Sequence, residues 1–145
     1  MTPDDGLEDL ARRIAAREAG RGDRRAAARD MADRLHADVT ACARRFARAV
    51  RQAGAPHLDL IRIGPVEPDD KSIRAFQVKL RRGRWEACVV SKDRGEVMLV
   101  GPYRLGGEQG PCNPFHIDAD PTERQRLDRE LPELLGRLIE AAFES

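Results

Sequence analysis

Hydrophobic residues recur every three or four positions over the first 52 residues, alternate with other residues between positions 72 and 103, and return to helical spacing after position 121. A period of 3.6 places side chains on one face of a helix, and a period of two places them on one face of a strand. The chain is therefore predicted to be α+β, with an antiparallel sheet between helices. Its length of 145 residues predicts one domain over 1–145.

Two helices are predicted at the N-terminus, as a helical hairpin over residues 3–53. Thr2 is expected to cap the first helix. The Gly-Arg-Gly run at 20–22 should end it, because glycine is a poor helix former. The second helix should then end at Gly54, a residue type common after the last helical turn. The apolar face of this second helix is expected to carry Met31, Leu35, Val39, Cys42, Phe46 and Val50.

A four-stranded antiparallel meander is predicted over residues 57–104, which are rich in β-branched and aromatic residues. A two-residue loop at 82–83 would place Leu80 opposite Trp85 in the central hairpin. A three-residue loop with glycine in the left-handed conformation is expected at 93–95. The predicted strands cover 57–63, 72–80, 85–91 and 96–103.

The second face of this sheet is also apolar, which is unusual for a sheet with one solvated face. We therefore expect it to be covered, either by a helix of the same chain or by a second subunit. The residues on this face are Cys88, Val90, Met98 and Val100.

The C-terminal part is predicted to be a loop over 105–119 and a helix over 120–144. Asp120 and Glu123 form a capping box at the start of this helix. Pro132 is expected to kink or split it, because proline lacks the backbone N–H of the helical ladder.

Charge and cysteine content limit the classes of partner and the cellular compartment that we expect for this chain. The chain has 26 basic and 25 acidic residues, a formal net charge of +1, which argues against a protein-wide footprint for nucleic acid or membrane. No apolar run approaches the length of a membrane helix, and the acidic N-terminus does not resemble a signal peptide. Three widely spaced cysteines fit neither a disulfide framework nor a metal motif. We therefore expect a cytoplasmic protein.

The best candidate site lies at one end of the predicted sheet. In a meander, the start of the first strand, the tip of the central hairpin and the end of the fourth strand meet there. Residues 71–94 carry 8 basic and 2 acidic side chains. Trp85 could either pack in the hairpin or stack a base, and the arginines could either be solvated or contact a ligand. The candidate binding residues are His57, Arg81, Arg82, Arg84, Trp85, Tyr103 and Arg104.

Cys112 and His116 are the weak catalytic candidates, since a thiolate and an imidazole can act as nucleophile and base. No family-specific cysteine signature surrounds Cys112, and an accidental pair is the better interpretation. With His57 they would supply at most three metal ligands, without a standard spacing. We expect neither a metal site nor a cofactor.

Three classes of function are open. The leading expectation is a non-catalytic protein-interaction module, such as an adaptor, accessory subunit or inhibitor, with self-association through the sheet face or the helix 23–53 as one form. The alternative is single-stranded nucleic-acid binding by residues 71–94. The strand order and the basic hairpin FQVKLRRGRW are loosely similar to PUR-type repeats, over about ten residues, and this resemblance implies single-strand binding. The third is a small enzyme with its site in the loop 105–117.

Overall fold

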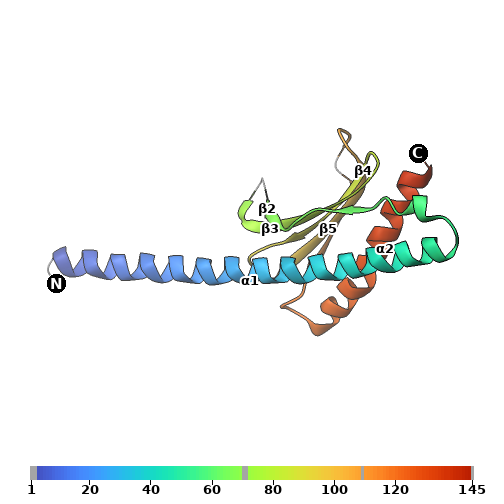
Figure 1. Ribbon diagram of the computed structural model, residues 1–145. Coiled ribbons are helices and arrows are strands. Elements are labelled where there is room, and N and C mark those ends of the chain that lie inside the picture. The colour runs from blue at the N-terminus through green and yellow to red at the C-terminus, as the bar shows by residue number, and fades with distance from the viewer. Residues whose placement is uncertain (1–2, 70–71, 109, 145) are drawn as a thin grey trace.

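The computed structural model describes residues 3–69, 72–108 and 110–144 (Figure 1). It is an α+β fold with an antiparallel sheet and a C-terminal helix, as predicted, but it has one long N-terminal helix and six strands. The elements are α1 (Pro3–Gln52), a 3-10 helix η1 (Pro56–Leu58), β1 (Arg62–Ile63), β2 (Glu67–Asp69), β3 (Ser72–Arg82), β4 (Trp85–Ser91), β5 (Glu96–Arg104), β6 (Cys112–His116) and α2 (Pro121–Glu144).

The predicted break at 20–22 is wrong, because α1 continues through both glycines for 50 residues. A glycine costs a helix about 1 kcal/mol relative to alanine, whereas a proline in its interior costs about 3 kcal/mol, and α1 has no proline after its first residue, Pro3. The predicted end at Gly54 is confirmed. Gly54 has a φ of 78°, and Ala55 donates to the carbonyl of Val50 at 2.8 Å. The predicted cap Thr2 lies outside the described residues.

Only the second half of α1 packs on the rest of the protein. From Ala28 onward the helix crosses one face of the sheet, and Ala28, Ala32, Leu35 and Val39 are buried there. Residues 5–27, here called the arm, are exposed except for the half-buried Gly20. Figure 1 shows the arm extending away from the sheet and α2. Its last turn reaches the sheet, where the guanidinium of Arg25 lies 5.1 Å from the ring centroid of Phe76.

The strands are ordered β1-β3-β4-β5-β6, with β2 also paired to β3, and all pairs are antiparallel. Of the first predicted strand, 57–63, only Arg62–Ile63 is extended, because 56–58 forms a 3-10 turn. β2 and β6 were not predicted. Both contain a proline, Pro68 and Pro114, which weakens a strand pattern but is tolerated at the edge of a sheet.

The central hairpin is correct in its faces and wrong in its register. Leu80 lies opposite Ala87, and Arg82 lies opposite Trp85, two residues away from the predicted pairing. The loop is Gly83-Arg84 with a φ of 60° at Gly83, so the glycine takes the first rather than the second loop position. A shift of two residues keeps every side chain on its predicted face. The predicted loop at 93–95 is confirmed, with Lys92 donating to the carbonyl of Glu96 at 2.8 Å.

Both helices pack on the same face of the sheet. Leu35 and Val39 of α1 are almost fully buried, as predicted, whereas Phe46 is only half-buried. The core between helices and sheet consists of Leu35, Val39, Val78, Leu80, Ala87, Val89, Val97, Leu99, Phe115, Leu127, Leu131, Leu134, Leu135 and Leu138.

On the opposite face, Cys88, Val90 and Val100 are buried and Met98 is half-buried, so the predicted burial is confirmed. Of the two covers expected, a helix of the same chain is wrong, because the core residues of α1 and α2 all contact the other face. Cover by a second subunit stays a prediction.

α2 runs without interruption from Pro121 to Glu144, with Pro132 inside it, so the helix is not split. Its predicted capping residue is confirmed, since the backbone N–H of Thr122 donates to Asp120 Oδ1 at 2.9 Å. This bond lowers the pKa of the Asp120 carboxyl. Within the described ranges, neither helix is long and apolar enough to cross a membrane.

Candidate functional site

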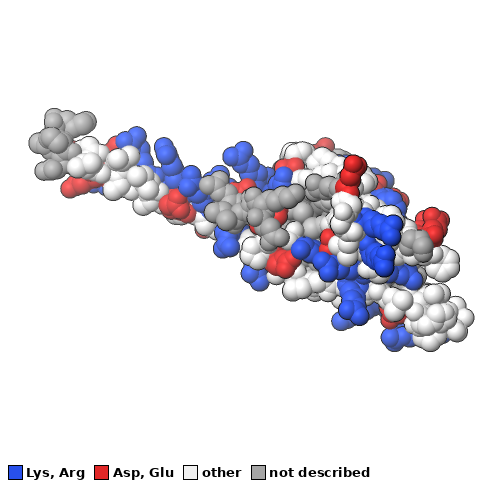
Figure 2. Space-filling model, turned by 90° about the horizontal axis from the view of Figure 1, so that it is seen from above, with Lys and Arg blue, Asp and Glu red and all other residues white. Residues whose placement is uncertain are grey.

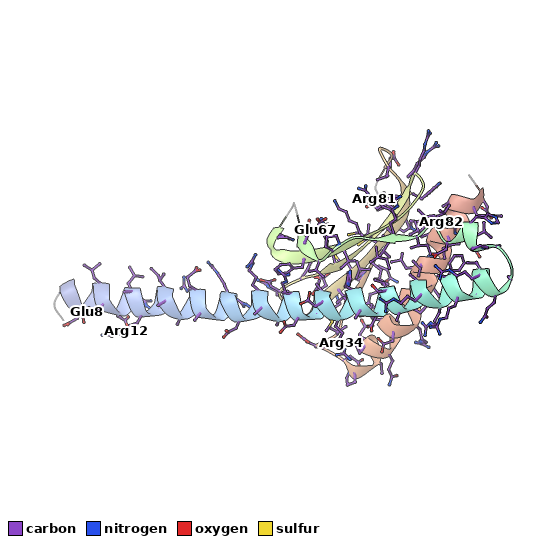
Figure 3. All side chains as sticks on the ribbon, in the orientation of Figure 1. Glu8, Arg12, Arg34, Glu67, Arg81 and Arg82 are labelled. Carbon is purple, nitrogen blue, oxygen red and sulfur yellow. The ribbon has the colours of Figure 1, made fainter. Side chains whose placement is uncertain are left out.

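The predicted gathering at the hairpin tip is largely observed. Trp85 pairs with Arg82 on one side and with Arg104 on the other, and Glu86 pairs with Tyr103. Arg84 lies exposed in the hairpin loop. His57 lies exposed in η1, ahead of the short strand β1. The two arginines Arg81 and Arg82 are seen at this end of the molecule in Figure 3.

These residues do not form one surface, because neighbouring positions of β3 point to opposite faces. Arg82 and Trp85 point to the face that the helices cover, and Trp85 packs against the core there. Arg81, Glu86 and Tyr103 lie on the other face. The side chains expected to bind a ligand together are therefore divided between two sides of the sheet.

A hydrogen-bonded triad occupies the face without helices. Glu86, which is 5% exposed, accepts from Arg81 Nε at 2.8 Å and from the Tyr103 hydroxyl at 2.6 Å. Burial, followed by the bond to Glu86, raises the pKa of Tyr103, and the same carboxylate raises the pKa of Arg81. Glu86 thus compensates the charge of Arg81, which leaves this arginine less available to a ligand.

Arg82 is a buried cation with an unsatisfied hydrogen-bond donor. It is 6% exposed, and its Nη1 has no hydrogen-bond partner within the described part of the chain. The guanidinium lies 5.8 Å from the ring centroid of Phe46, at the far end of α1 from the arm. The indole N–H of Trp85 is buried and unpartnered in the same way. The two groups lie inside the molecule, where a nucleic-acid backbone or base does not reach.

Cys112 and His116 begin and end β6, and both are exposed. Four residues along a strand span about 13 Å, too far for a thiol and an imidazole to exchange a proton. Among the residues that the structure describes, no group of three His, Cys, Asp or Glu side chains could hold a metal ion.

Cys88 is the buried counterpart of Cys112. Burial, followed by the charge of Glu86, raises the pKa of the Cys88 thiol to about 12. Its sulfur lies 3.6 Å from Gln77 Oε1, to which the thiol donates.

The two thiols should therefore differ sharply in reactivity, because only the thiolate is alkylated and Cys88 is also shielded from the reagent. We expect iodoacetamide at pH 8 to label Cys112 rapidly and Cys88 only after denaturation. Peptide mass spectrometry of the native and the denatured protein measures both. Equal labelling of the two cysteines in the native protein would contradict the burial of this sheet face.

A groove with a volume of about 550 Å³ lies beside the second half of α1. Its lining combines apolar side chains with arginines spaced along one side of the helix. Arg51 lies 3.4 Å from Asp59, whereas Arg44 and Arg48 have no ion pair within the described ranges. This α1 groove is lined by Thr40, Ala43, Arg44, Ala47, Arg48, Arg51, Asp59, Ile61 and Ile63.

The arm carries an apolar stripe that touches no other element. Leu7, Leu10 and Ile14 are 65%, 44% and 50% exposed, although they recur at the spacing of a packed helix face. Charged side chains on the polar side of the arm form ion pairs with one another. Its ion pairs include Glu8–Arg12 at 3.5 Å, Asp9–Arg13 at 3.4 Å and Arg21–Glu18 at 2.8 Å.

The charged residues of the arm and of the rest of the protein are arranged differently. Figure 2 shows acidic and basic side chains interspersed along the arm, and basic side chains gathered on the body away from its tip. Figure 3 places Glu8 and Arg12 near the free end of the arm, far from Arg81 and Arg82.

Sequence reasoning missed both the arm and the α1 groove. Because a break was predicted at 20–22, the first helix was expected to fold back on the second. In that arrangement the stripe would have packed against the second helix. The available signal was the lack of proline between Pro3 and Pro56.

Comparison with known proteins found no match, whether to a protein-family model, a curated protein or a solved structure.

Proposed function

We propose that this protein is a non-catalytic interaction module whose docking element is the arm. The observation that carries the proposal is the stripe of Leu7, Leu10 and Ile14, which is exposed on the part of α1 that extends beyond the sheet. Exposed apolar stripes at helical spacing are typical of helices that dock on a partner.

The energetics of the arm also favour a partner. Gly6, Gly20 and Gly22 each cost the helix about 1 kcal/mol relative to alanine. The ion pairs Glu8–Arg12, Asp9–Arg13 and Arg21–Glu18 are exposed, and each such pair returns only about 0.3–0.5 kcal/mol. Most helices in proteins obtain their stability from packing of an apolar face. The arm is therefore a helix that docking would stabilise.

A photo-crosslinking amino acid at position 10 tests this proposal. Leu10 lies on the stripe, whereas Arg12, two residues on, lies on the opposite side of the helix and serves as the matched control. In its native cells, the chain should form a defined polypeptide adduct from position 10 and not from position 12. Adducts of equal yield from both positions, or none from position 10, would show that the arm is not a docking element.

The single-strand alternative has less support. Of its proposed contacts, Arg82 and Trp85 point toward the core, and Arg81 and Tyr103 are engaged by Glu86. Arg84, Arg94 and Arg104 are exposed, as is Arg81, whose charge Glu86 compensates. So few arginines contact few phosphates, and this hairpin offers little electrostatic affinity for a strand.

A further inference from the structure

We propose that the partner of the arm is a second copy of this chain, in an antiparallel two-fold pair where each arm lies in the α1 groove of the other copy. This inference rests on the proposed function of the arm and names its occupant. Four features of the chain support it: the position of stripe and groove on α1, their charges, their lengths and the exposed area.

The stripe and the apolar lining of the groove lie on overlapping sides of α1. Thr40, Ala43 and Ala47 line the groove, and each follows a stripe residue by 33 positions, in the order Leu7, Leu10 and Ile14. Thirty-three residues make about 9.2 turns at 3.6 residues per turn, so the apolar lining of the groove is rotated by about 60° from the stripe. A two-fold axis beside the middle of α1 therefore turns the stripe of each copy toward the groove of the other.

Charge selects the antiparallel orientation. Residues 3–11 carry four acidic side chains and no basic one, whereas residues 39–52 carry four basic side chains and no acidic one. A parallel pair would align like charges, and an antiparallel pair aligns the acidic block of each copy with the basic block of the other. Arg44 and Arg48, which have no ion pair within the described residues, gain a counter-charge in this way.

The lengths of the two halves also match. The arm covers residues 5–27, and the packed part of α1 covers 28–52. An axis near residue 27 brings Leu7 against the partner's Ala47 and Ile14 against the partner's Thr40. It also places Glu8 between the partner's Arg44 and the partner's Arg48. The small side chains of the groove leave room for the larger Leu and Ile of the stripe.

The exposed area fits a dimer. The chain exposes 9411 Å², whereas a compact monomer of 16.2 kDa exposes about 7,450 Å². The excess of about 2,000 Å² is more than the roughly 800 Å² that each partner buries in a standard interface. Docking of both arms would remove much of this excess.

Charge exchange between Glu8 and Arg48 tests the pairing. Sedimentation velocity of the unmodified chain should give a dimer of twice 16.2 kDa. Glu8→Arg and Arg48→Glu should each weaken dimerisation about tenfold or more, because like charges then face each other at both ends. The double variant should return to within about threefold of the unmodified chain. Asp9→Arg, on the outer side of the arm, is the matched control and should leave the dimer intact.

A disulfide tests the register directly. Leu7→Cys with Ala47→Cys should form an intermolecular bond in a background with Cys42→Ser and Cys112→Ser. The two positions lie about 60 Å apart within one helix, so no intramolecular bond can form. Arg12→Cys with Ala47→Cys is the control that should not cross-link.

The outcomes separate this inference from the proposed function. A monomer at all concentrations, a double variant no better than the single ones, or a dimer that survives removal of residues 2–24 would each overturn the antiparallel pair. An adduct from position 10 to a different protein would overturn the pair while leaving the arm a docking element. The pair stands if the dimer requires the arm, the charge exchange restores it and the 7–47 disulfide forms.

Discussion

Replacing Phe115 by alanine should lower the free energy of unfolding by about 3–5 kcal/mol, the usual cost of removing a buried phenyl ring. Phe115 is fully buried in β6 and belongs to the core between sheet and helices. The guanidinium of Arg126 lies 4.0 Å from its ring centroid and also donates to the carbonyl of Pro114 at 2.9 Å. The ring therefore joins an edge strand to α2, and its loss leaves a cavity between them.

Urea denaturation followed by circular dichroism measures this effect. His116→Ala is the matched control, because His116 is the exposed neighbour of Phe115 in β6 and its removal should change stability by less than about 0.5 kcal/mol. A loss below 1 kcal/mol for Phe115→Ala would mean that β6 is not part of the core.

The helical regions at both ends of the chain and the faces of β3 and β4 followed from periodicity, whereas the number of N-terminal helices did not. Leu35 and Val39 were placed in the core, and the inward and outward residues of β3 and β4 were correct, because a buried face imposes its period on the sequence. The register of the hairpin did not follow from the sequence, since Gly83 is compatible with either position of a two-residue loop. A shift of two residues also leaves every side chain on the same face of the sheet, so the apolar pattern does not exclude it.

The strand β6 and the arm did not follow from sequence for different reasons. β6 is a five-residue edge strand containing Pro114, and its one buried residue is too weak a signal to separate it from a loop. The arm depends on whether two glycines stop a helix. Each glycine costs only about 1 kcal/mol, so packing of the rest of the helix decides whether it continues through them.

The candidate site was located in chain position but not in orientation. The sequence predicts that Arg82, Trp85 and Tyr103 lie at one end of the sheet, and they lie there in the structure. The direction of Arg82 depends on the register of the hairpin and on the position of Phe46 in α1. These are tertiary features, and an arginine in a basic hairpin is normally exposed.

Arg82 is a buried charged side chain whose burial is only partly compensated. An unsatisfied buried donor costs about 1–3 kcal/mol, and Nη1 of Arg82 has no partner within the described residues. The ring of Phe46 lies at 5.8 Å, near the limit of about 6 Å for a cation–π contact, so it returns about 0.5–1 kcal/mol. The unfavourable free energy of desolvating the charge is therefore larger than the favourable free energy of the contact with Phe46.

Arg82→Met should accordingly raise the free energy of unfolding by about 1–2 kcal/mol, because methionine keeps an unbranched apolar chain against Phe46 and Trp85 and removes the unpartnered donor. Urea denaturation of this variant measures the gain. Arg84→Met, at the exposed position of the same hairpin, is the matched control and should change stability by less than about 0.5 kcal/mol. A loss of stability for Arg82→Met would mean that the guanidinium is compensated at this corner, and that its burial holds the hairpin on α1.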